Sequence, residues 1–313
     1  MAYSISLIHE ARFPVQKYGG TERVVWWLAK GLSELGHQVN LVSLSGSSCP
    51  FAKVYEIAGP RPKADLEHFF STPTFEPSTP YLVTIEGNAK AGETFLPNTV
   101  FVSQNHARRH GSNAYVYNGL DPSDYVFEED KKGELLFLAK ASWAVKNVAG
   151  AIRIARLSGK KLNIVGGSRW WCPVWRGVHW RGMLGGGEKA NWIAKSQGLL
   201  FPVLWNEPFG IAVTEALVSG TPVLATPFGS LPELIHSEVG RICKNYGEFV
   251  EGVKSLGAFK AKDCRDWALS RFHYLDMAKK YVEKYETVLA GKKLNPVSPR
   301  APIQIEKVPF EFT

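Results

Sequence analysis

Residues 206–226 read NEPFGIAVTEALVSGTPVLAT, and two glutamates in this stretch, Glu207 and Glu215, are separated by seven residues. Pro208 is tolerated in a first helical turn, because the N–H group that it lacks would have no partner there. The Gly-Thr-Pro sequence later in the stretch stops a helix and prevents its continuation. A helix is therefore expected over residues 209–219, with one glutamate before its start and the other inside it.

The start of the expected helix is suited to bind an anion. Its first backbone N–H groups have no partners within the helix, the helix dipole is positive there, and Gly210 lets a ligand approach the backbone closely. Glu207 and Glu215 are too far apart for the carboxyl pair of a retaining glycosidase, which needs a separation of about 5 Å. They could instead hold the two hydroxyl-bearing ends of a nucleotide diphosphate sugar. The alternative is an ordinary amphipathic helix with two solvated glutamates.

The stretch resembles the donor-binding motif of family 4 retaining glycosyltransferases, which are glycosyl transferases of group 1. The matching residues are Glu207, Pro208, Phe209, Gly210, Glu215, Ala216, Gly220, Thr221, Pro222, Val223, Gly229, Pro232, Glu233 and Gly240. The resemblance implies that Glu207 and the backbone of Phe209 and Gly210 contact the transferred sugar. Ile211 would belong to the same donor-binding turn, and Glu215 would hold the ribose hydroxyls.

The same resemblance implies an α/β chain with the GT-B fold. Two Rossmann-like domains with parallel sheets would face each other across a cleft, and a C-terminal helix would cross back. A chain of 313 residues with 45% hydrophobic content is long enough for two cores. The expected divisions are a lean acceptor-side domain, a nucleotide-sugar donor domain, a crossover helix and an extended tail, over residues 1–130, 131–272, 273–290 and 291–313.

The chain opens with a predicted parallel unit: a buried strand over residues 4–8, a glycine-containing loop, a helix over residues 21–35 and a second strand. The loop lacks the Gly-x-Gly-x-x-Gly fingerprint, which argues against a dinucleotide oxidoreductase. The sequence YGGTERVV, residues 18–25, resembles the N-terminal glycine loop of the same glycosyltransferases. That resemblance implies that Gly19 and Gly20 face the donor.

Glu86 occupies a position at which this sequence differs from the family. The next part of the chain is rich in Ser, Pro and Gly, and its expected strands cover residues 53–57, 81–85, 99–103 and 114–117. Family members often carry a Thr-x-His-Gly sequence after the strand that matches residues 81–85, but this chain reads Thr-Ile-Glu-Gly. A carboxylate there could accept the proton of an acceptor hydroxyl or stabilise positive charge on the sugar. The alternative is a strand-end glutamate that faces water.

Two lysines are the candidates for binding the donor phosphates. Lys140 and Lys146 follow a strand predicted over residues 135–139 and precede a helix that ends near Leu157. Open α/β sheets bind ligands at the carboxyl ends of their strands, and lysine suits phosphate. The family places an arginine and a lysine in this loop, and Lys140 matches the arginine with a gap one residue longer than usual. The alternative is a pair of surface lysines.

Two further motifs have alternative interpretations. The sequence RWWCPVWRGVHWR, residues 169–181, places tryptophans between arginines, which suits stacking on bases or sugars as well as ordinary packing. His106 and His110 could face one way on a helix as metal ligands, but the glutamate of a His-Glu-x-x-His site is missing. We therefore expect no metal and no cofactor beyond the nucleotide sugar itself.

The net charge of +8 is typical of a protein with an anionic partner. Nucleotide sugar, anionic membrane and nucleic acid all qualify. The charged residues near the N-terminus argue against a signal peptide, and no run of about 18 apolar residues occurs. We expect a cytoplasmic protein, at most peripheral at the inner membrane face.

The expected function is metal-independent, retaining transfer of a hexose from a UDP- or GDP-type donor to a hydroxyl of a glycan, glycolipid or other acceptor. Three alternatives stay open: an epimerase or phosphorylase of the same fold, a non-catalytic nucleotide-sugar-binding module, and a transferase that modifies a nucleic acid base.

Overall fold

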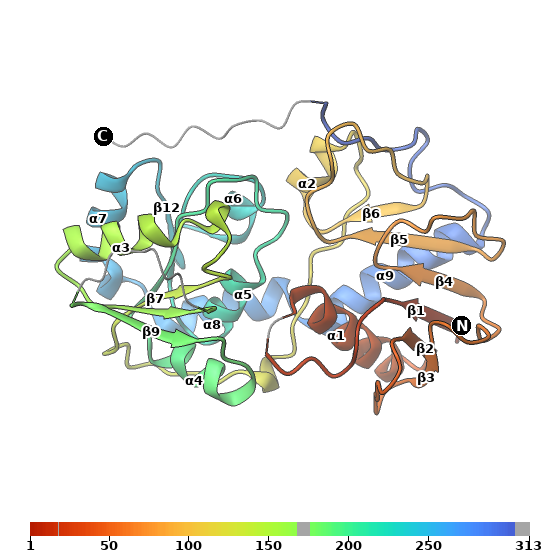
Figure 1. The fold of residues 1–313 in the computed structure, drawn as a ribbon, viewed down its shortest axis with the longest axis horizontal. Helices are drawn as coiled ribbons and strands as arrows, with labels where there is room; N and C mark the ends of the chain where they lie inside the picture. The colour runs from red at the N-terminus through yellow and green to blue at the C-terminus, as the bar shows by residue number, and fades with distance from the viewer. Residues whose placement is uncertain (18, 168–175, 304–313) are drawn as a thin grey trace. The chain divides into compact units, whose positions relative to one another are not determined.

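The computed structural model describes residues 1–17, 19–167 and 176–303, and within them the chain forms two compact α/β units. Unit 1 contains residues 1–15, 19–120 and 272–303, and unit 2 contains residues 16–17, 121–167 and 176–271. Each unit is built around one six-stranded sheet. Figure 1 labels many of their strands and helices.

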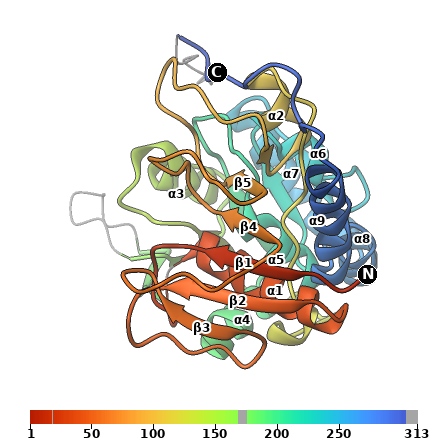
Figure 2. The same ribbon diagram turned by 90° about the vertical axis from the view of Figure 1, so that its right-hand side faces the viewer.

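The sheet of unit 1 is parallel throughout, with strand order β3-β2-β1-β4-β5-β6. Figure 2 shows the first five of these strands side by side in that order. The central strands are almost fully buried, as expected for a parallel sheet that is covered on both faces. The strands are β1 (Ser4–Ile8), β2 (Gln38–Ser43), β3 (Lys53–Glu56), β4 (Leu66–Phe69), β5 (Tyr81–Ile85) and β6 (Thr99–Phe101).

Three helices belong to unit 1: α1 (Gly20–Glu34), α2 (Gln104–Arg109) and α9 (Tyr274–Leu289). The chain leaves unit 1 after Leu120 and returns to it at Phe272, where the Leu120 N–H donates to the Phe272 carbonyl at 2.8 Å. Helix α9 then packs against α1 and β5. The return of the C-terminal helix to the first unit confirms the crossover that the GT-B resemblance implies.

Strand β4 is a strand that we did not predict, because its sequence is LEHF in a segment rich in Ser, Pro and Gly. The expected strand at residues 114–117 is wrong, since only Tyr115 forms an isolated bridge, to Phe101. Residues 291–303 of the expected tail belong to unit 1, where the Ala301 N–H donates to the Glu93 carbonyl at 2.7 Å. The boundary expected after residue 130 lies within unit 2, which takes over from unit 1 at residue 121.

A chain of buried side chains fastens α9 to the sheet of unit 1. Tyr285 and His68 lie 2.8 Å apart through their hydroxyl and Nδ1 atoms, and His68 Nε2 lies 2.8 Å from the Thr84 hydroxyl. The Thr84 hydroxyl in turn lies 3.0 Å from that of Tyr281. Burial lowers the pKa of His68 to about 3, so the ring is neutral at pH 7.

Acid should therefore weaken unit 1 through His68. In the unfolded chain the ring has a pKa near 6.5 and becomes protonated below that pH. In the folded protein the ring stays neutral until about pH 3. The stabilising effect is fully present above pH 6.5 and is lost as the pH falls toward 3, by on the order of 4 kcal/mol. Urea unfolding at a series of pH values, compared between the wild type and His68→Gln, measures the difference. Parallel pH profiles for the two proteins would show that His68 does not contribute in this way.

The sheet of unit 2 is also parallel, with strand order β12-β11-β10-β7-β8-β9. Its strands are β7 (Leu135–Leu138), β8 (Leu162–Val165), β9 (Val178–Gly182), β10 (Gly198–Phe201), β11 (Val223–Ala225) and β12 (Gly240–Ile242). The α-helices of unit 2 are α3 (Val148–Leu157), α4 (Gly186–Lys195), α5 (Ile211–Val218), α6 (Leu231–Leu234), α7 (Tyr246–Lys254) and α8 (Ala261–Arg271). Short 3₁₀ turns cover Pro122–Asp124, Ala144–Lys146 and Leu256–Ala258.

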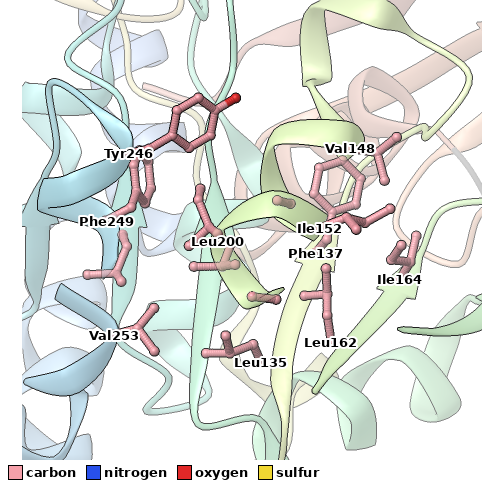
Figure 3. Close-up of a cluster of buried hydrophobic side chains, with 14 of the residues drawn as sticks. Leu135, Phe137, Val148, Ile152, Leu162, Ile164, Leu200, Tyr246, Phe249 and Val253 are labelled. Atoms are coloured by element: carbon pink, nitrogen blue, oxygen red, sulfur yellow. The ribbon is translucent and has the colours of Figure 1, made fainter. Parts of the chain in front are cut away.

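One hydrophobic cluster joins α3 and α7 to the sheet of unit 2 (Figure 3). The strands contribute side chains such as Leu135 and Leu200, α3 contributes Ile152, and α7 contributes Phe249 and Val253. Burying a side chain of this size is worth about 1.5–3 kcal/mol. The cluster fixes β7 and β10 next to each other, and these are the two strands whose following loops carry Lys146 and Glu207.

Some expectations lie outside the described residues: Tyr18 of the glycine loop, residues 169–175 of the tryptophan-rich segment, and the last part of the tail, residues 304–313. In the parts that the structure does describe, no helix is both long and apolar enough to cross a lipid bilayer.

Candidate functional site

Helix α5 begins two residues later than the sequence predicts. Its N-cap is Gly210, at a φ of 99°, and the helix runs Ile211–Val218. This left-handed backbone conformation favours glycine, and it makes the chain turn sharply from Phe209 into the helix. Pro208 therefore lies before the helix and not in its first turn. The predicted anion-binding feature, a helix start with a glycine beside it, is present, because no side chain caps the N-terminus.

Glu207 and Lys146 form a buried ion pair. Lys146 Nζ lies 2.9 Å from Glu207 Oε1 and 2.7 Å from Oε2, and the two residues are 9% and 6% exposed. Trp205 Nε1 donates to Glu207 Oε2 at 2.5 Å. The lysine follows β7 and the glutamate follows β10, which are neighbours in the sheet. The structure thus brings together two residues that the sequence predicts for the donor site but that are 61 positions apart.

The backbone of Glu207 is fixed as firmly as its side chain. Its carbonyl accepts the Ser230 N–H at 2.9 Å, and a bridge joins it to Gly229. A Cβ atom on Gly229 would lie 2.2 Å from the Glu207 carbonyl oxygen, so only glycine allows this approach. The carboxylate is therefore held at a defined position three residues before the N-cap of α5.

An aromatic pair links the two lysines of the β7 loop. Lys140 Nζ lies 5.2 Å from the ring centroid of Trp143, whose ring meets that of Trp205 edge to face at 6.2 Å. Lys146 Nζ lies 4.7 Å from the ring centroid of Trp205. Both contacts are within the range of cation–π attraction. Lys140 is therefore connected to the Lys146–Glu207 pair through the rings of Trp143 and Trp205.

Glu215 belongs to a separate cluster deeper in unit 2. It is 4% exposed, and its Oε1 accepts both the Tyr125 hydroxyl, at 2.6 Å, and a short contact from Lys189 Nζ. Lys189 comes from α4 and is itself buried. The alternative of two solvated glutamates is therefore wrong, because both carboxylates are buried and both have a lysine partner.

The predicted residues of unit 1 lie at the carboxyl ends of its strands and at the start of α1. Gly19 is the N-cap of α1, at a φ of 152°, and Gly20 is the first helical residue. Glu22, in the first turn, lies 4.0 Å from His9 Nε2, which follows β1. Burial lowers the pKa of His9, although the charge of Glu22 opposes this shift.

Glu86 follows β5, and its carboxyl group is shielded from solvent. Asn118 Nδ2 donates to Glu86 Oε2 at 2.7 Å, whereas Oε1 has no hydrogen-bonding partner among the described residues. Burial raises the pKa of Glu86 to about 7, although the hydrogen bond from Asn118 lowers it. The alternative of a carboxylate facing water is therefore wrong.

His106 and His110 pack together inside unit 1. Their ring centroids are 4.9 Å apart, His110 Nδ1 lies 2.7 Å from the His106 carbonyl oxygen, and the His110 ring stacks on Phe101 at 4.6 Å. Burial lowers the pKa of both rings. Within the described ranges, no group of three or more His, Cys, Asp and Glu side chains could hold a metal ion.

Sequence reasoning missed the partners of these predicted residues. Tyr125 and Lys189 both bind Glu215 from positions 90 and 26 residues away, and no local pattern marks them. Trp205 is close to Glu207 in the sequence, and an indole N–H two residues before a motif carboxylate could have been recognised as a donor to it. Asn118 is 32 positions from Glu86 in the sequence, so only the fold reveals their contact.

Residues 133–258 match the model of the family described as glycosyl transferases group 1. A curated relative, an uncharacterized 41.2 kDa protein in the cps region of Klebsiella pneumoniae, is 29% identical over 107 residues. That match spans 32% of this chain and 30% of the relative.

Solved structures of other proteins share the fold of this chain over 91–92% of its length. AviGT4, a glycosyltransferase involved in avilamycin A biosynthesis, is 24% identical, covers 92% of this chain and 98% of its own, and has a TM-score of 0.78. Sucrose-phosphate synthase from Thermosynechococcus elongatus is 14% identical, with 92% and 100% coverage and a TM-score of 0.72. HepE from Anabaena, in complex with UDP-glucose, is 14% identical, with 91% and 100% coverage and a TM-score of 0.66. These likenesses establish the GT-B fold.

Proposed function

We propose that this chain is a glycosyltransferase of the group 1 type, and that it transfers a sugar from a nucleotide diphosphate donor to an acceptor hydroxyl with retention of the anomeric configuration. One observation carries the proposal: the Lys146–Glu207 ion pair lies just before the open N-terminus of α5, on loops that follow adjacent parallel strands. This is the position at which open α/β sheets bind phosphorylated ligands.

The charges of unit 2 favour a diphosphate-containing donor. Lys140 and Lys146 supply positive charge, and the N–H groups at the start of α5 supply hydrogen-bond donors for a diphosphate. Glu207 would contact sugar hydroxyls near the backbone of Phe209, Gly210 and Ile211. Glu215 would accept hydrogen bonds from the ribose. Neighbours support a nucleotide sugar, since HepE was solved with UDP-glucose and starch synthase IV from Arabidopsis thaliana with ADP and acarbose.

The hydrogen bonding of Glu207 favours retention without a covalent intermediate on this residue. Both carboxylate oxygens accept hydrogen bonds from Lys146, which makes the group a weak nucleophile. The acceptor hydroxyl would attack the anomeric carbon from the face that the diphosphate leaves. The new bond joins the acceptor oxygen to the anomeric carbon, the bond from that carbon to the phosphate oxygen breaks, and the hydroxyl proton passes to the departing phosphate.

Residues of unit 1 would contact the acceptor and the donor phosphate. Glu86, beside Asn118, would contact the acceptor, and Gly19 and Gly20 would approach the donor phosphate. The proposed reaction needs no metal, because lysines and helix N–H groups stabilise the leaving diphosphate. The acceptor would be a hydroxyl of a glycan or of a lipid-linked sugar.

A panel of radiolabelled UDP- and GDP-sugars, incubated with glycan arrays, tests the function. Controls without acceptor measure hydrolysis and reveal an epimerised sugar. We expect label on at least one acceptor together with release of the nucleoside diphosphate. A chain that binds none of the nucleotide sugars and none of the nucleoside diphosphates is not a transferase of this kind.

Glu215 and Glu207 should affect different kinetic constants. Glu215→Ala is expected to raise the donor KM by about tenfold, because hydrogen bonds from the ribose to a charged group are lost in both ground and transition states. Glu207→Ala should raise KM less and mainly lower kcat. Since Glu215→Ala also leaves Lys189 buried without its carboxylate, Glu215→Gln serves as the milder variant, with thermal unfolding as the check on folding. Equal changes in both constants for the two variants would contradict the assigned roles.

A further inference from the structure

Several buried polar atoms near the carboxyl ends of the unit 1 strands have no hydrogen-bonding partner among the described residues. Among them are His9 Nε2, Thr72 Oγ1, Glu86 Oε1 and Asn118 Oδ1. Folded proteins satisfy the great majority of such atoms, because each unsatisfied one costs about 1–3 kcal/mol. Unpartnered acceptor atoms at the carboxyl ends of the strands are therefore suited to bind a ligand that donates hydrogen bonds.

The fold brings three of these residues to one place. Strand β4 lies between β1 and β5, and His9 and Glu86 directly follow those outer two strands. The His9 ring lies 6.0 Å from that of Phe70, the residue that follows β4. Asn118 is 2% exposed and is attached to Glu86 by its amide nitrogen, which leaves its oxygen beside the carboxyl group.

The chemistry of the cluster calls for a hydrogen-bond donor. Asn118 Oδ1 accepts only, and so does Glu86 Oε1 when the carboxyl is ionised. A second carboxylate, Glu22, lies near enough to act on this group: after burial, the charge of Glu22 is a further cause that raises the pKa of Glu86. Burial also lowers the pKa of His9 and so favours its neutral form.

We propose that the cluster of Glu86, Asn118, Glu22 and His9 binds an ammonium group, so that the acceptor is an amino sugar or a related aminated polyol. An ammonium group offers three donors, enough for Glu86 Oε1 and Asn118 Oδ1, and its charge offsets two carboxylates. The identification of the ligand as the acceptor rests on the proposed function. The ammonium group anchors the acceptor, and a separate hydroxyl of the same molecule takes the sugar.

Three matched sugars test the proposal by direct binding. D-glucosamine, D-glucose and N-acetyl-D-glucosamine are titrated into the full chain by isothermal titration calorimetry or ligand-observed NMR, with and without UDP. Glucosamine is expected to bind at least about tenfold more tightly than the other two, the difference typical of a hydrogen bond to a charged group. Equal binding of the three, or no binding of glucosamine, overturns the proposal.

Variants separate the cluster from other negative charges. Glu86→Gln keeps the size of the side chain and its contact with Asn118, and should abolish the preference for glucosamine. Glu76→Gln removes an exposed carboxylate from unit 1 and should leave the preference unchanged. A preference that survives Glu86→Gln in a protein with a normal Tm contradicts the assignment. Titration with UDP-glucose and GDP-mannose on the same samples tests the proposed function separately, since a chain could bind the amine and no nucleotide sugar.

Discussion

Glu207→Gln is expected to lower kcat by about 10²–10³-fold, with a much smaller change in donor KM. The substitution keeps the shape of the side chain but removes the charge that Lys146 and Trp205 hold next to the start of α5. Removing one electrostatic contact with charge that develops in a transition state typically costs about this much. The measurement is steady-state kinetics with the donor and acceptor that the panel identifies.

A matched control for this variant is Glu238→Gln. Glu238 is also in unit 2, but its side chain is 75% exposed and lies away from the β7 and β10 loops in sequence. It should leave both kinetic constants unchanged. A Glu207→Gln enzyme with near-normal kcat would remove Glu207 from the reaction.

Lys146→Met is expected to cost both stability and activity. Glu207 would stay buried at 6% exposure without its cation, and breaking a buried ion pair in this way costs about 3–5 kcal/mol. The loss of the phosphate-binding charge should also lower kcat/KM by about 10²-fold or more. Urea unfolding and steady-state kinetics measure the two effects.

The double variant Lys146→Met with Glu207→Gln distinguishes stability from function. Removing both charges should restore most of the lost free energy of unfolding, because no uncompensated charge stays buried, but should restore no activity. Lys254→Met is the control, since Lys254 and Glu251 form an exposed pair worth at most about 1 kcal/mol. Recovery of activity in the double variant would mean that the pair has only a structural role.

Strands with continuous apolar sequence could be predicted almost to the residue. Strands β1 and β5 have the expected bounds, because hydrophobic runs bounded by polar or turn residues define them locally. Strand β4 could not be predicted in this way. Its sequence places Glu67 and His68 in the core, and His68 is tolerated there only because Thr84 and Tyr285 contact its two ring nitrogens.

In the candidate site, too, residues marked by a local motif could be predicted, whereas contacts that depend on the fold could not. The motif located Glu207, Gly210 and Glu215, and the strand–loop pattern located Lys146, since each depends on a local signal. The predicted start of α5 is two residues too early. Pro208 suggested a helix that begins beside it, but Gly210 adopts a φ of 99°, which is not helical, so the helix begins at Ile211. The pairing of Glu215 with Lys189 depends on how α4 packs beside α5, which short-range sequence patterns do not encode.

The anomeric configuration of the product tests the central claim most directly. NMR of the product formed from an α-linked nucleotide sugar should show an α-glycoside, as expected for attack from the face that the diphosphate leaves. A β-glycoside from the same donor would contradict front-face transfer at the Lys146–Glu207 site.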